Sequence, residues 1–185
     1  MSRPIRQRKR IYLGCEGPSE QFYGKRLNEI ADAAGLSLFL DCDVLGGGDP
    51  LALIRLSVKR IHEKVKKRGT FAYRAILLDR DRLGQAHSRD RQIPTLLNAH
   101  KLCLIWQDPC HEGFLLRHLA ERTAMRPPTS DLAAQALLRL WPEYRKGMPA
   151  SELAARIDQM AIERAASAEP DLLTFLRAIG FAGKA

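Results

Sequence analysis

The sequence predicts an α/β protein with a mostly parallel, four-stranded sheet flanked by helices and followed by a C-terminal helical appendage. Three observations lead to this fold class. Between residues 10 and 126, strand-like apolar runs alternate four times with segments of helical spacing. Most of these runs are continuously apolar, as expected for parallel strands buried on both faces. After residue 126 the chain changes to segments rich in Ala, Leu and Arg.

The first half of the α/β region contains two strands and two helices. Residues 11–15 (IYLGC) form a β-prone run that ends at a Glu-Gly-Pro break. Ser19 is positioned to cap a helix that ends at Gly35. Residues 36–44 alternate and predict the second strand, after which Asp49 and Pro50 predict the start of a long basic helix reaching about residue 68. The apolar positions of the first helix are Phe22, Tyr23, Leu27, Ile30, Ala31 and Ala34.

The second half repeats this order. An apolar run over residues 71–78 predicts the third strand, which leads directly into Asp79-Arg80-Asp81. A shorter helix is expected over residues 93–100 and a fourth strand over 102–106. The next helix starts behind Asp108-Pro109 and carries the apolar residues Phe114, Leu115, Leu116 and Leu119. Residues 129–180 predict three short helices, with breaks near 142–149 and near Pro170. We therefore expect a basic arm (1–9), the α/β domain (10–126) and a helical region (127–185), which either caps the domain or binds a partner.

Composition limits the function classes. The 185 residues include 30 Lys and Arg against 21 Asp and Glu, a net charge of +9 that favours a polyanionic partner such as nucleic acid. A solvated basic surface is the alternative. No stretch is apolar enough to cross a membrane, and the basic start lacks the features of a secretory signal. Cys15, Cys42, Cys103 and Cys110 form no CxxC pair, which favours free thiols in the cytoplasm.

Acidic residues follow three of the predicted strands. Glu16 comes after the first strand, Asp79 and Asp81 after the third, and Asp108 with Glu112 after the fourth. Because parallel strands end at one edge of a sheet, we expect these carboxylates to converge there, together with Glu20. Converging carboxylates repel each other unless a hard cation such as Mg²⁺ lies among them. A lysine or arginine that permanently neutralised this edge would exclude the interpretation.

Each of these residues also has a simpler explanation. Glu20 and Glu112 lie in first helical turns, where a negative charge is favourable anyway. Glu16 fits an ordinary turn, and Asp108 fits a helix cap. Gly46, Gly47 and Gly48 either bind a phosphate or form a flexible turn, and the Lys-Ser/Thr of an ATP-binding P-loop is missing. His111 lies near the expected acidic edge, where it contacts phosphate or moves protons, or it is an ordinary surface or core histidine.

Four motifs, CEGPSE, GGGDPL, LLDRDRLG and QDPCHEGFLLRHL, occur in this order between residues 10 and 120. With them the chain resembles the RloB-like family, whose core is related to the Toprim domain. The resemblance implies a Toprim-like fold with functional acids at Glu16, Asp79 and Asp81. The EGxxE pattern of the related OLD-type nucleases implies that Glu20 also binds metal. The family's Asn-Pro and Phe-Glu segment departs here, with Asp at 108 and His111 in place of Phe, and leaves Glu112 in register.

The resemblance also implies a bacterial phage-defence protein that is often encoded with an AAA-type ATPase, and nuclease activity through kinship. We therefore expect a Mg²⁺- or Mn²⁺-dependent nuclease. In this hypothesis Asp79 and Asp81 hold one ion, and Glu16 shares it or positions the attacking water. Glu20 and Glu112 complete a second metal site, and Glu112 is counted with the catalytic acids. The residues expected to contact nucleic acid are Lys59, Arg60, Lys64, Lys67, Arg80, Arg82 and His111.

Two other functions fit the same residues. The first is a non-catalytic nucleic-acid-binding subunit of a defence ATPase, whose metal site is structural or degenerate. The second is a phosphohydrolase of small phosphate esters that uses Asp79 as its nucleophile. The basic surface exceeds what a small ester requires, which disfavours the second.

Overall fold

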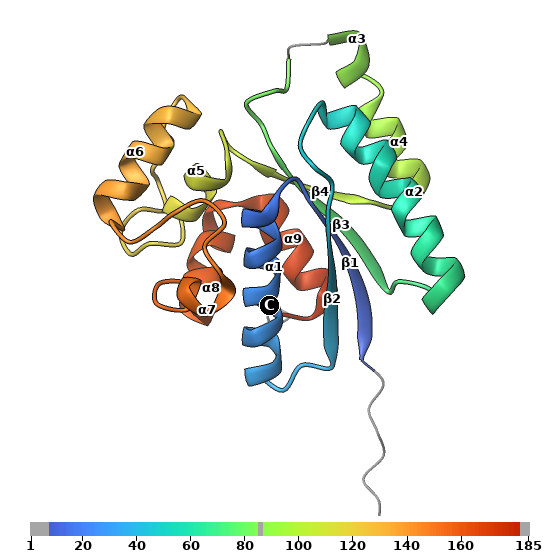
Figure 1. The fold of residues 1–185 in the computed structure, drawn as a ribbon, viewed down its shortest axis with the longest axis horizontal. Coiled ribbons are helices and arrows are strands. Elements are labelled where there is room, and N and C mark those ends of the chain that lie inside the picture. Colours follow the sequence, from blue (N-terminus) through green and yellow to red (C-terminus); the bar gives the residue numbers. More distant parts are fainter. Residues whose placement is uncertain (1–7, 85–86, 182–185) are drawn as a thin grey trace, which may run out of the picture.

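The structure, a computed structural model, describes residues 8–84 and 87–181 and confirms the predicted fold class. Strands β1 (Lys9–Cys15), β2 (Leu38–Val44), β3 (Tyr73–Asp79) and β4 (Cys103–Gln107) form one parallel sheet in the order β2-β1-β3-β4 (Figure 1). Cys15 pairs with Val44 on one side and Leu77 on the other, and Asp79 pairs with Gln107. The carboxyl ends of all four strands therefore lie at one edge of the sheet.

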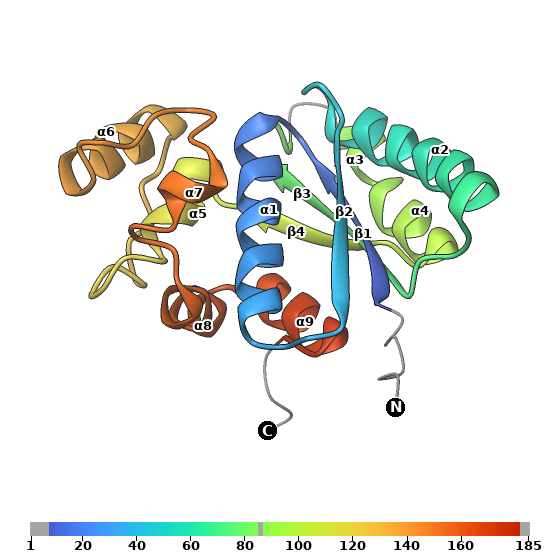
Figure 2. The ribbon, with the colours of Figure 1, turned by 60° about the horizontal axis from the view of Figure 1, so that its bottom comes forward.

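Helices cover both faces of the sheet (Figures 1 and 2). On one face, α1 (Pro18–Ala33) and α9 (Pro170–Ile179) join a core that includes Leu13 and Leu77. On the other face, α2 (Pro50–Arg68) and α4 (Ile93–His100) join a second core that includes Tyr12 and Leu78. Successive strand residues thus point to opposite cores, as the two-residue period of a strand requires.

The N-termini of α1 and α2 both lie near the carboxyl ends of the strands. Ser19 was expected to cap α1, and this is wrong: Gly17 is the N-cap residue, Pro18 opens the helix, and Ser19 lies in its first turn. The Ser19 hydroxyl instead accepts a hydrogen bond from Gly147 N over 3.0 Å. Asp49 caps α2 as predicted, because its Oδ1 accepts from Ala52 N over 2.9 Å.

Several other element bounds differ slightly from the prediction. β2 and β3 each begin two residues later than expected, at Leu38 and Tyr73, and β4 is shifted by one residue. The four-residue α3 (His87–Asp90) was not predicted. The helix after β4, α5 (His111–Leu116), has Glu112 in its first turn as expected, but its N-cap residue is Cys110 rather than Asp108, and it ends at Leu116.

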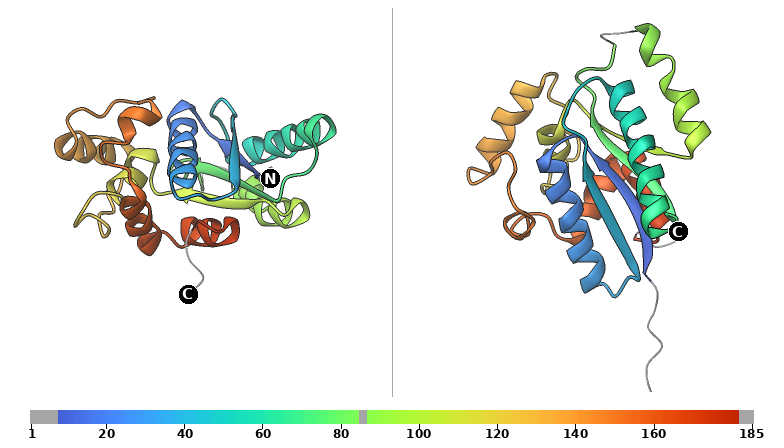
Figure 3. Two further views of the ribbon diagram at one scale, coloured as in Figure 1. Left: turned by 90° about the horizontal axis from the view of Figure 1, so that it is seen from below. Right: turned by 45° about the vertical axis from the view of Figure 1, so that its right-hand side comes forward.

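The last helix of the C-terminal region, α9, packs against the sheet, and the rest of this region lies to the side of the sheet (Figure 3). Within the described residues the region contains α6 (Ser130–Leu140), α7 (Ala150–Leu153), α8 (Gln159–Ala168) and α9, one helix more than predicted because α7 forms behind Pro149. The ring centroids of Phe175 and Tyr73 lie 6.1 Å apart, and Glu169 pairs with the buried Arg117. Residues on both sides of the expected boundary at 126/127 therefore share one hydrophobic core.

The helices and the cysteines bear on two expectations, namely that no segment crosses a membrane and that the thiols are free. None of the helices within residues 8–84 and 87–181 is both long and apolar enough to span a membrane. Cys15, Cys42, Cys103 and Cys110 are all free thiols, as predicted.

Candidate functional site

Five carboxylates gather at the carboxyl edge of the sheet, and we call them the acid cluster. Their order in the chain follows the topology: one lies behind β1, one in the first turn of α1, two at the end of β3, and one in the first turn of α5. Four of them line a cavity of about 630 Å³, and the fifth, Asp81, lies beside it. The members of the acid cluster are Glu16, Glu20, Asp79, Asp81 and Glu112.

The closest link within the cluster joins its first and third members. Glu16 Oε2 accepts a hydrogen bond from the backbone N–H of Asp79 over 3.0 Å. This contact forms because β1 and β3 are neighbours in the sheet and end at matching register. Burial raises the pKa of Glu16, and the charges of Glu20 and Asp81 raise it further, while the Asp79 amide and Arg82 lower it.

Asp79 is the most strongly perturbed acid. Burial raises its pKa to about 8, and the charges of the other four cluster members all contribute in the same direction. Its Oδ1 is buried and has no hydrogen-bond partner among the described residues. A buried carboxylate oxygen without a donor is costly, so a bound cation would relieve both the missing partner and the mutual repulsion.

Glu20 and His111 form the buried wall of the cavity. Glu20 Oε2 accepts from Gly17 N over 2.8 Å, and its Oε1 lies 3.6 Å from His111 Nδ1. The same His111 nitrogen lies 2.7 Å from Gln107 Nε2. His111 is only 3% exposed but lines the cavity, so the phosphate contact expected of it stays a prediction. In this structure its role is to pack against Glu20 and Gln107.

The other two acids are held by the C-terminal region. Ser130 Oγ donates to Asp81 Oδ2 over 2.8 Å, and Tyr144 OH donates to Glu112 Oε1 over 3.2 Å. Lys146 Nζ lies 3.9 Å from the same oxygen of Glu112. Burial acts to raise the pKa of Glu112, but the charges of His111 and Lys146 and local hydrogen bonds outweigh burial, and the net shift is downward.

Sequence reasoning missed these C-terminal contacts. Ser130, Tyr144, Lys146 and Gly147 come from segments without strands, so no topological rule placed them at the carboxyl edge. The Lys146 side chain lines the cavity and is 81% exposed, which leaves its ammonium free to move. It therefore does not neutralise the acid cluster permanently, and it can contact an anionic ligand there.

Of the expected basic contacts, Arg80 and Arg82 lie at the acid edge. Arg80 Nη1 is 3.7 Å from Asp108 Oδ2, and both side chains are about half exposed. Arg82 is exposed and close enough to lower the pKa of Glu16. Asp108 pairs with Arg80 rather than joining the acid cluster. Both arginines are thus placed to contact a phosphate that enters from solvent.

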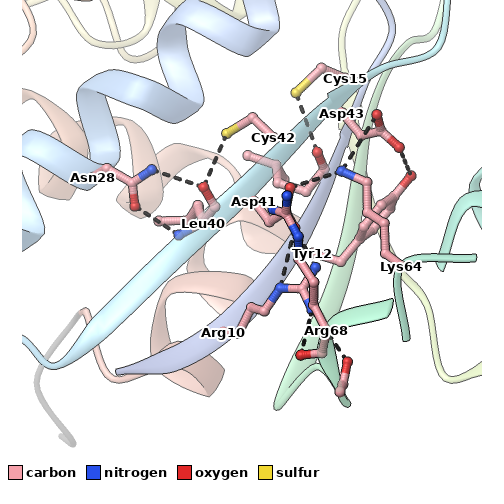
Figure 4. A network of polar contacts seen from close by, with 12 residues as sticks. Arg10, Tyr12, Cys15, Asn28, Leu40, Asp41, Cys42, Asp43, Lys64 and Arg68 are labelled. Carbon is pink, nitrogen blue, oxygen red and sulfur yellow. Dashed lines mark hydrogen bonds and ion pairs between the residues drawn. The ribbon is translucent and has the colours of Figure 1, made fainter. Parts of the chain in front are cut away.

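The basic residues of α2 lie elsewhere, and one of them is engaged. Lys64 Nζ pairs with Asp41 Oδ1 at 2.8 Å and with Asp43 Oδ1 at 3.6 Å (Figure 4). Two carboxylates of β2 thus neutralise Lys64 in this structure, and the prediction that it contacts nucleic acid remains untested. Lys59 and Arg60 before Lys64, and Lys67 after it, are exposed on the same helix.

Arg10 fixes where α2 ends. Its Nη2 pairs with Asp41 Oδ2 at 2.6 Å, and its Nη1 donates to the carbonyl oxygen of Arg68 over 3.1 Å (Figure 4). Arg10 stands at the start of β1, so the C-terminus of α2 lies at the amino end of the sheet, opposite the acid cluster. Of the expected basic arm, residues 1–7 lie outside the described residues, and Arg8 pairs with Asp32 at 3.1 Å.

The three glycines after β2 form a turn that positions Glu16. Gly46 N and Gly47 N donate to the Glu16 carbonyl oxygen over 3.1 and 3.0 Å. All three glycines have positive φ, which explains why glycine is needed here. Two of the three amides are already used, so the turn alternative accounts for these residues better than a phosphate cradle does.

The side chains of the acid cluster have the right ligand atoms for a metal ion, but their present arrangement does not hold one. The acid cluster offers carboxylate oxygens, the ligands that Mg²⁺ and Mn²⁺ prefer. In the part of the chain that the structure describes, however, no group of three or more His, Cys, Asp or Glu side chains is arranged to hold an ion. Metal binding therefore requires side-chain rotation, for which the cavity beside Asp79 provides space.

The chain was also compared with known proteins. No family model, no curated protein and no solved structure matches it. The functional interpretation accordingly depends on the acid cluster and its surroundings.

Proposed function

We propose that this protein is a Mg²⁺- or Mn²⁺-dependent nuclease that hydrolyses phosphodiester bonds, acting in the cytoplasm in a bacterial phage-defence system. The observation that carries the nuclease proposal is the state of Asp79. It is buried among four other carboxylates, its pKa is raised to about 8, and one of its oxygens lacks a partner. Such an arrangement is unfavourable by itself and becomes favourable around a divalent cation. The defence role and an AAA-type ATPase partner come from the resemblance to the RloB-like family.

Each acid has a defined part in this proposal. Asp79 and Asp81 would hold the cation, and Glu16, fixed by the Asp79 amide, would share it or orient the attacking water. When bound, the ion supplies charge stabilisation for the phosphate and lowers the pKa of a water molecule. Glu20 and Glu112 would hold a second ion after Glu112 exchanges its contact with Tyr144.

Three cations would position the substrate. Arg80 and Arg82 lie on the solvent side of the acid cluster, and Lys146 lies across the cavity on the C-terminal region. Together they would bind phosphate oxygens on both sides of the cleaved bond. Lys146 would add a phosphate contact that the sequence did not predict, in the cavity that His111 also lines.

Two alternatives remain to be tested. An accessory subunit without catalysis is favoured by one observation: within the described residues no metal-binding group is preformed. A phosphohydrolase with Asp79 as nucleophile is disfavoured, because the exposed cations of α2 exceed what a small phosphate ester requires.

The deciding experiment is a cleavage assay with the full chain. Plasmid DNA, single-stranded DNA and RNA are incubated with Mg²⁺, Mn²⁺ or EDTA, and the parent is compared with Asp79→Asn/Asp81→Asn. We expect metal-dependent cleavage by the parent and a cleavage rate at least about 100-fold lower in the variant. This loss is larger than the one usually seen when a residue that hydrogen-bonds to a metal ligand is changed. The matched control is Asp32→Asn/Asp171→Asn, two exposed aspartates outside the cavity, which keeps parental activity.

Two outcomes would contradict the proposal. If the double variant cuts as fast as the parent, the assigned site is wrong. If the parent binds nucleic acid in a salt-sensitive way, cuts none of the three substrates and co-purifies with an ATPase from its host, the accessory-subunit alternative is correct.

A further inference from the structure

The outward side of α2 carries a concentrated positive charge that the acid site does not use. Seven of its 19 residues are Lys or Arg, and Glu63 is its one acidic residue. The buried side of the helix contacts the sheet through residues such as Ile54 and Ile61. We call the exposed cations of the opposite side the basic face; they are Arg55, Lys59, Arg60, Lys66 and Lys67.

The side chains of the basic face form no ion pair with any residue that the structure describes. Within the described ranges this holds for Lys59, Arg60, Lys66 and Lys67, and the Arg55 guanidinium donates a hydrogen bond to the uncharged side chain of Gln92 over 2.9 Å. Lys64 differs, because it points toward β2 and pairs with Asp41. The cations that remain are therefore available to an external anion.

The chemistry of the basic face favours a phosphate backbone over other anionic partners. The exposed large hydrophobic residues in the described ranges, Phe39, Leu132, Leu138 and Met160, all lie outside α2. A helix that inserts into a membrane surface or binds an apolar peptide groove needs such residues on its exposed side. A surface of cations without apolar side chains is typical of contacts to nucleic-acid phosphates.

The basic face extends away from the acid cluster. α2 begins behind the glycine turn that binds Glu16 and ends beside Arg10 at the opposite end of the sheet. With a rise of about 1.5 Å per residue, Lys67 lies roughly 25 Å along the helix from Pro50. Arg82, which is exposed near Glu16, adds positive charge at the acid-cluster end, whereas Arg89 pairs there with Asp49 at 3.1 Å.

We propose that the basic face is a second phosphate-binding surface, which holds double-stranded nucleic acid at a distance from the acid cluster. This inference rests on the proposed nuclease function and specifies its substrate as a duplex long enough to reach both places. At about 3.4 Å per base pair, 25 Å corresponds to roughly seven base pairs. A duplex is stiff over this length, so it contacts both places without the ordering cost that a single strand incurs.

The test measures binding separately from cleavage. Fluorescence anisotropy follows labelled duplexes of about 6 and about 24 base pairs, and a single strand of the longer length, in EDTA, where the proposed cleavage cannot occur. The parent is compared with Lys59→Gln/Arg60→Gln/Lys67→Gln. The control Arg139→Gln/Arg156→Gln/Arg177→Gln removes the same charge from exposed positions on the C-terminal region. Thermal unfolding verifies that both variants fold.

We expect the α2 variant to bind the long duplex at least about tenfold more weakly than the parent does. The slope of log affinity against log salt concentration should also be smaller, corresponding to about two to three fewer released counterions. The short duplex should bind the parent more weakly than the long duplex does, because it cannot reach both places at once. The single strand should also bind the parent more weakly than the long duplex, and the control should stay within about threefold of the parent. Equal losses in both triple variants, or none in the α2 variant, would overturn the proposal. Preferential α2-dependent binding of polyglutamate or of anionic lipid vesicles would overturn it in favour of an acidic protein or a membrane.

The outcome also separates this proposal from the nuclease proposal. If α2-dependent duplex binding is found in a parent that cleaves nothing, the basic face is supported and the nuclease function fails. If the parent cleaves but binds duplexes independently of α2, the nuclease function stands and the basic face does not.

Discussion

Glu16 and Asp79 are 63 residues apart, yet the Glu16 carboxylate accepts a hydrogen bond from the Asp79 backbone N–H. The contact brings two acids together at the end of adjacent strands, although two like charges repel each other. Only the amide, and not the Asp79 carboxyl, is satisfied by this bond, since Asp79 Oδ1 has no partner among the described residues. The fold thus holds an electrostatically unfavourable group in place, which is common where a protein binds a cation.

The first prediction concerns the stability cost of Asp79. Its pKa is raised from an ordinary value near 4 to about 8, so the folded state prefers the protonated form while the unfolded state ionises. Asp79 therefore lowers stability as the pH rises through this window. Asp79→Asn should increase the free energy of unfolding at pH 7 in EDTA by about 1 to 3 kcal/mol.

Urea unfolding between pH 5 and pH 8 measures this effect. The stability gain of Asp79→Asn should grow with pH, whereas the exposed control Asp171→Asn should show a constant difference from the parent. A variant that is less stable than the parent at pH 7 would mean that Asp79 is not under the repulsion described here.

The second prediction concerns His118. Its Nδ1–H donates to the Phe114 carbonyl oxygen over 3.0 Å, and its Nε2 accepts from Tyr23 OH over 2.9 Å, so the neutral ring is held by both nitrogens. Burial lowers its pKa from 6.5 to about 3. Below pH 6.5 the unfolded state therefore takes up a proton that the folded state does not, and stability falls as the pH decreases toward 3.

This contribution amounts to at most about 1.4 kcal/mol per pH unit. His118→Gln should lower stability at pH 7 but reduce the slope of stability against pH between about 6 and 4. Urea unfolding gives both quantities. An unchanged slope, or a histidine NMR signal that shows His118 charged at pH 5 in the folded protein, would contradict the prediction.

The third prediction concerns Lys146. Its ammonium lines the cavity beside Glu112 and its side chain is mostly exposed, so removing it should leave the fold intact within about 0.5 kcal/mol. Lys146→Ala should raise KM for cleavage by about tenfold, because a phosphate contact is lost. The control Lys25→Ala removes an exposed lysine that contacts Phe22 and does not line the cavity. Equal KM values for the parent and both variants would exclude Lys146 from substrate binding.

The fourth prediction concerns Gly113, which fixes the approach of α5 to the end of β4. A Cβ at this position would lie 2.7 Å from Pro109 Cδ and 2.8 Å from the Asp108 carbonyl oxygen. Gly113→Ala should therefore destabilise the protein by about 1 to 3 kcal/mol, since backbone has to move. At Gly17 a Cβ would meet only the Glu20 carboxylate, at 3.3 Å, so Gly17→Ala should cost less. Chemical unfolding of both variants tests the order, and a reversed order would contradict it.

Much of the fold could be predicted from the sequence because the strands carry a strong signal. Residues 75–78 are continuously apolar, which predicts a strand buried on both faces of a parallel sheet. Because Asp79 follows directly, the same run also predicted that the acids lie at the carboxyl end of this strand. Asp49 with Pro50 marked the start of α2 for an equally local reason. The short α7 carried no comparable signal.

The parts of the site that could not be predicted depend on tertiary packing. Tyr144 and Lys146 reach Glu112 because the C-terminal region folds back over the carboxyl edge of the sheet, and no local pattern reveals such a return. The charge of Lys64 suggested a surface role, but the two carboxylates that bind it lie on β2, about 20 residues away in the chain. His111 was placed near the acid cluster correctly, but its burial could not be derived from a helical position alone.

The central claim, that the acid cluster binds a divalent cation, is tested most directly by anomalous diffraction from crystals soaked in Mn²⁺. We expect a peak in the cavity beside Asp79, with carboxylate oxygens of Asp79 and of Glu16 or Asp81 within about 2.3 Å, and no peak there in Asp79→Asn/Asp81→Asn. A parent crystal with no peak at these side chains under saturating Mn²⁺, or with its peak at another place, would contradict the claim.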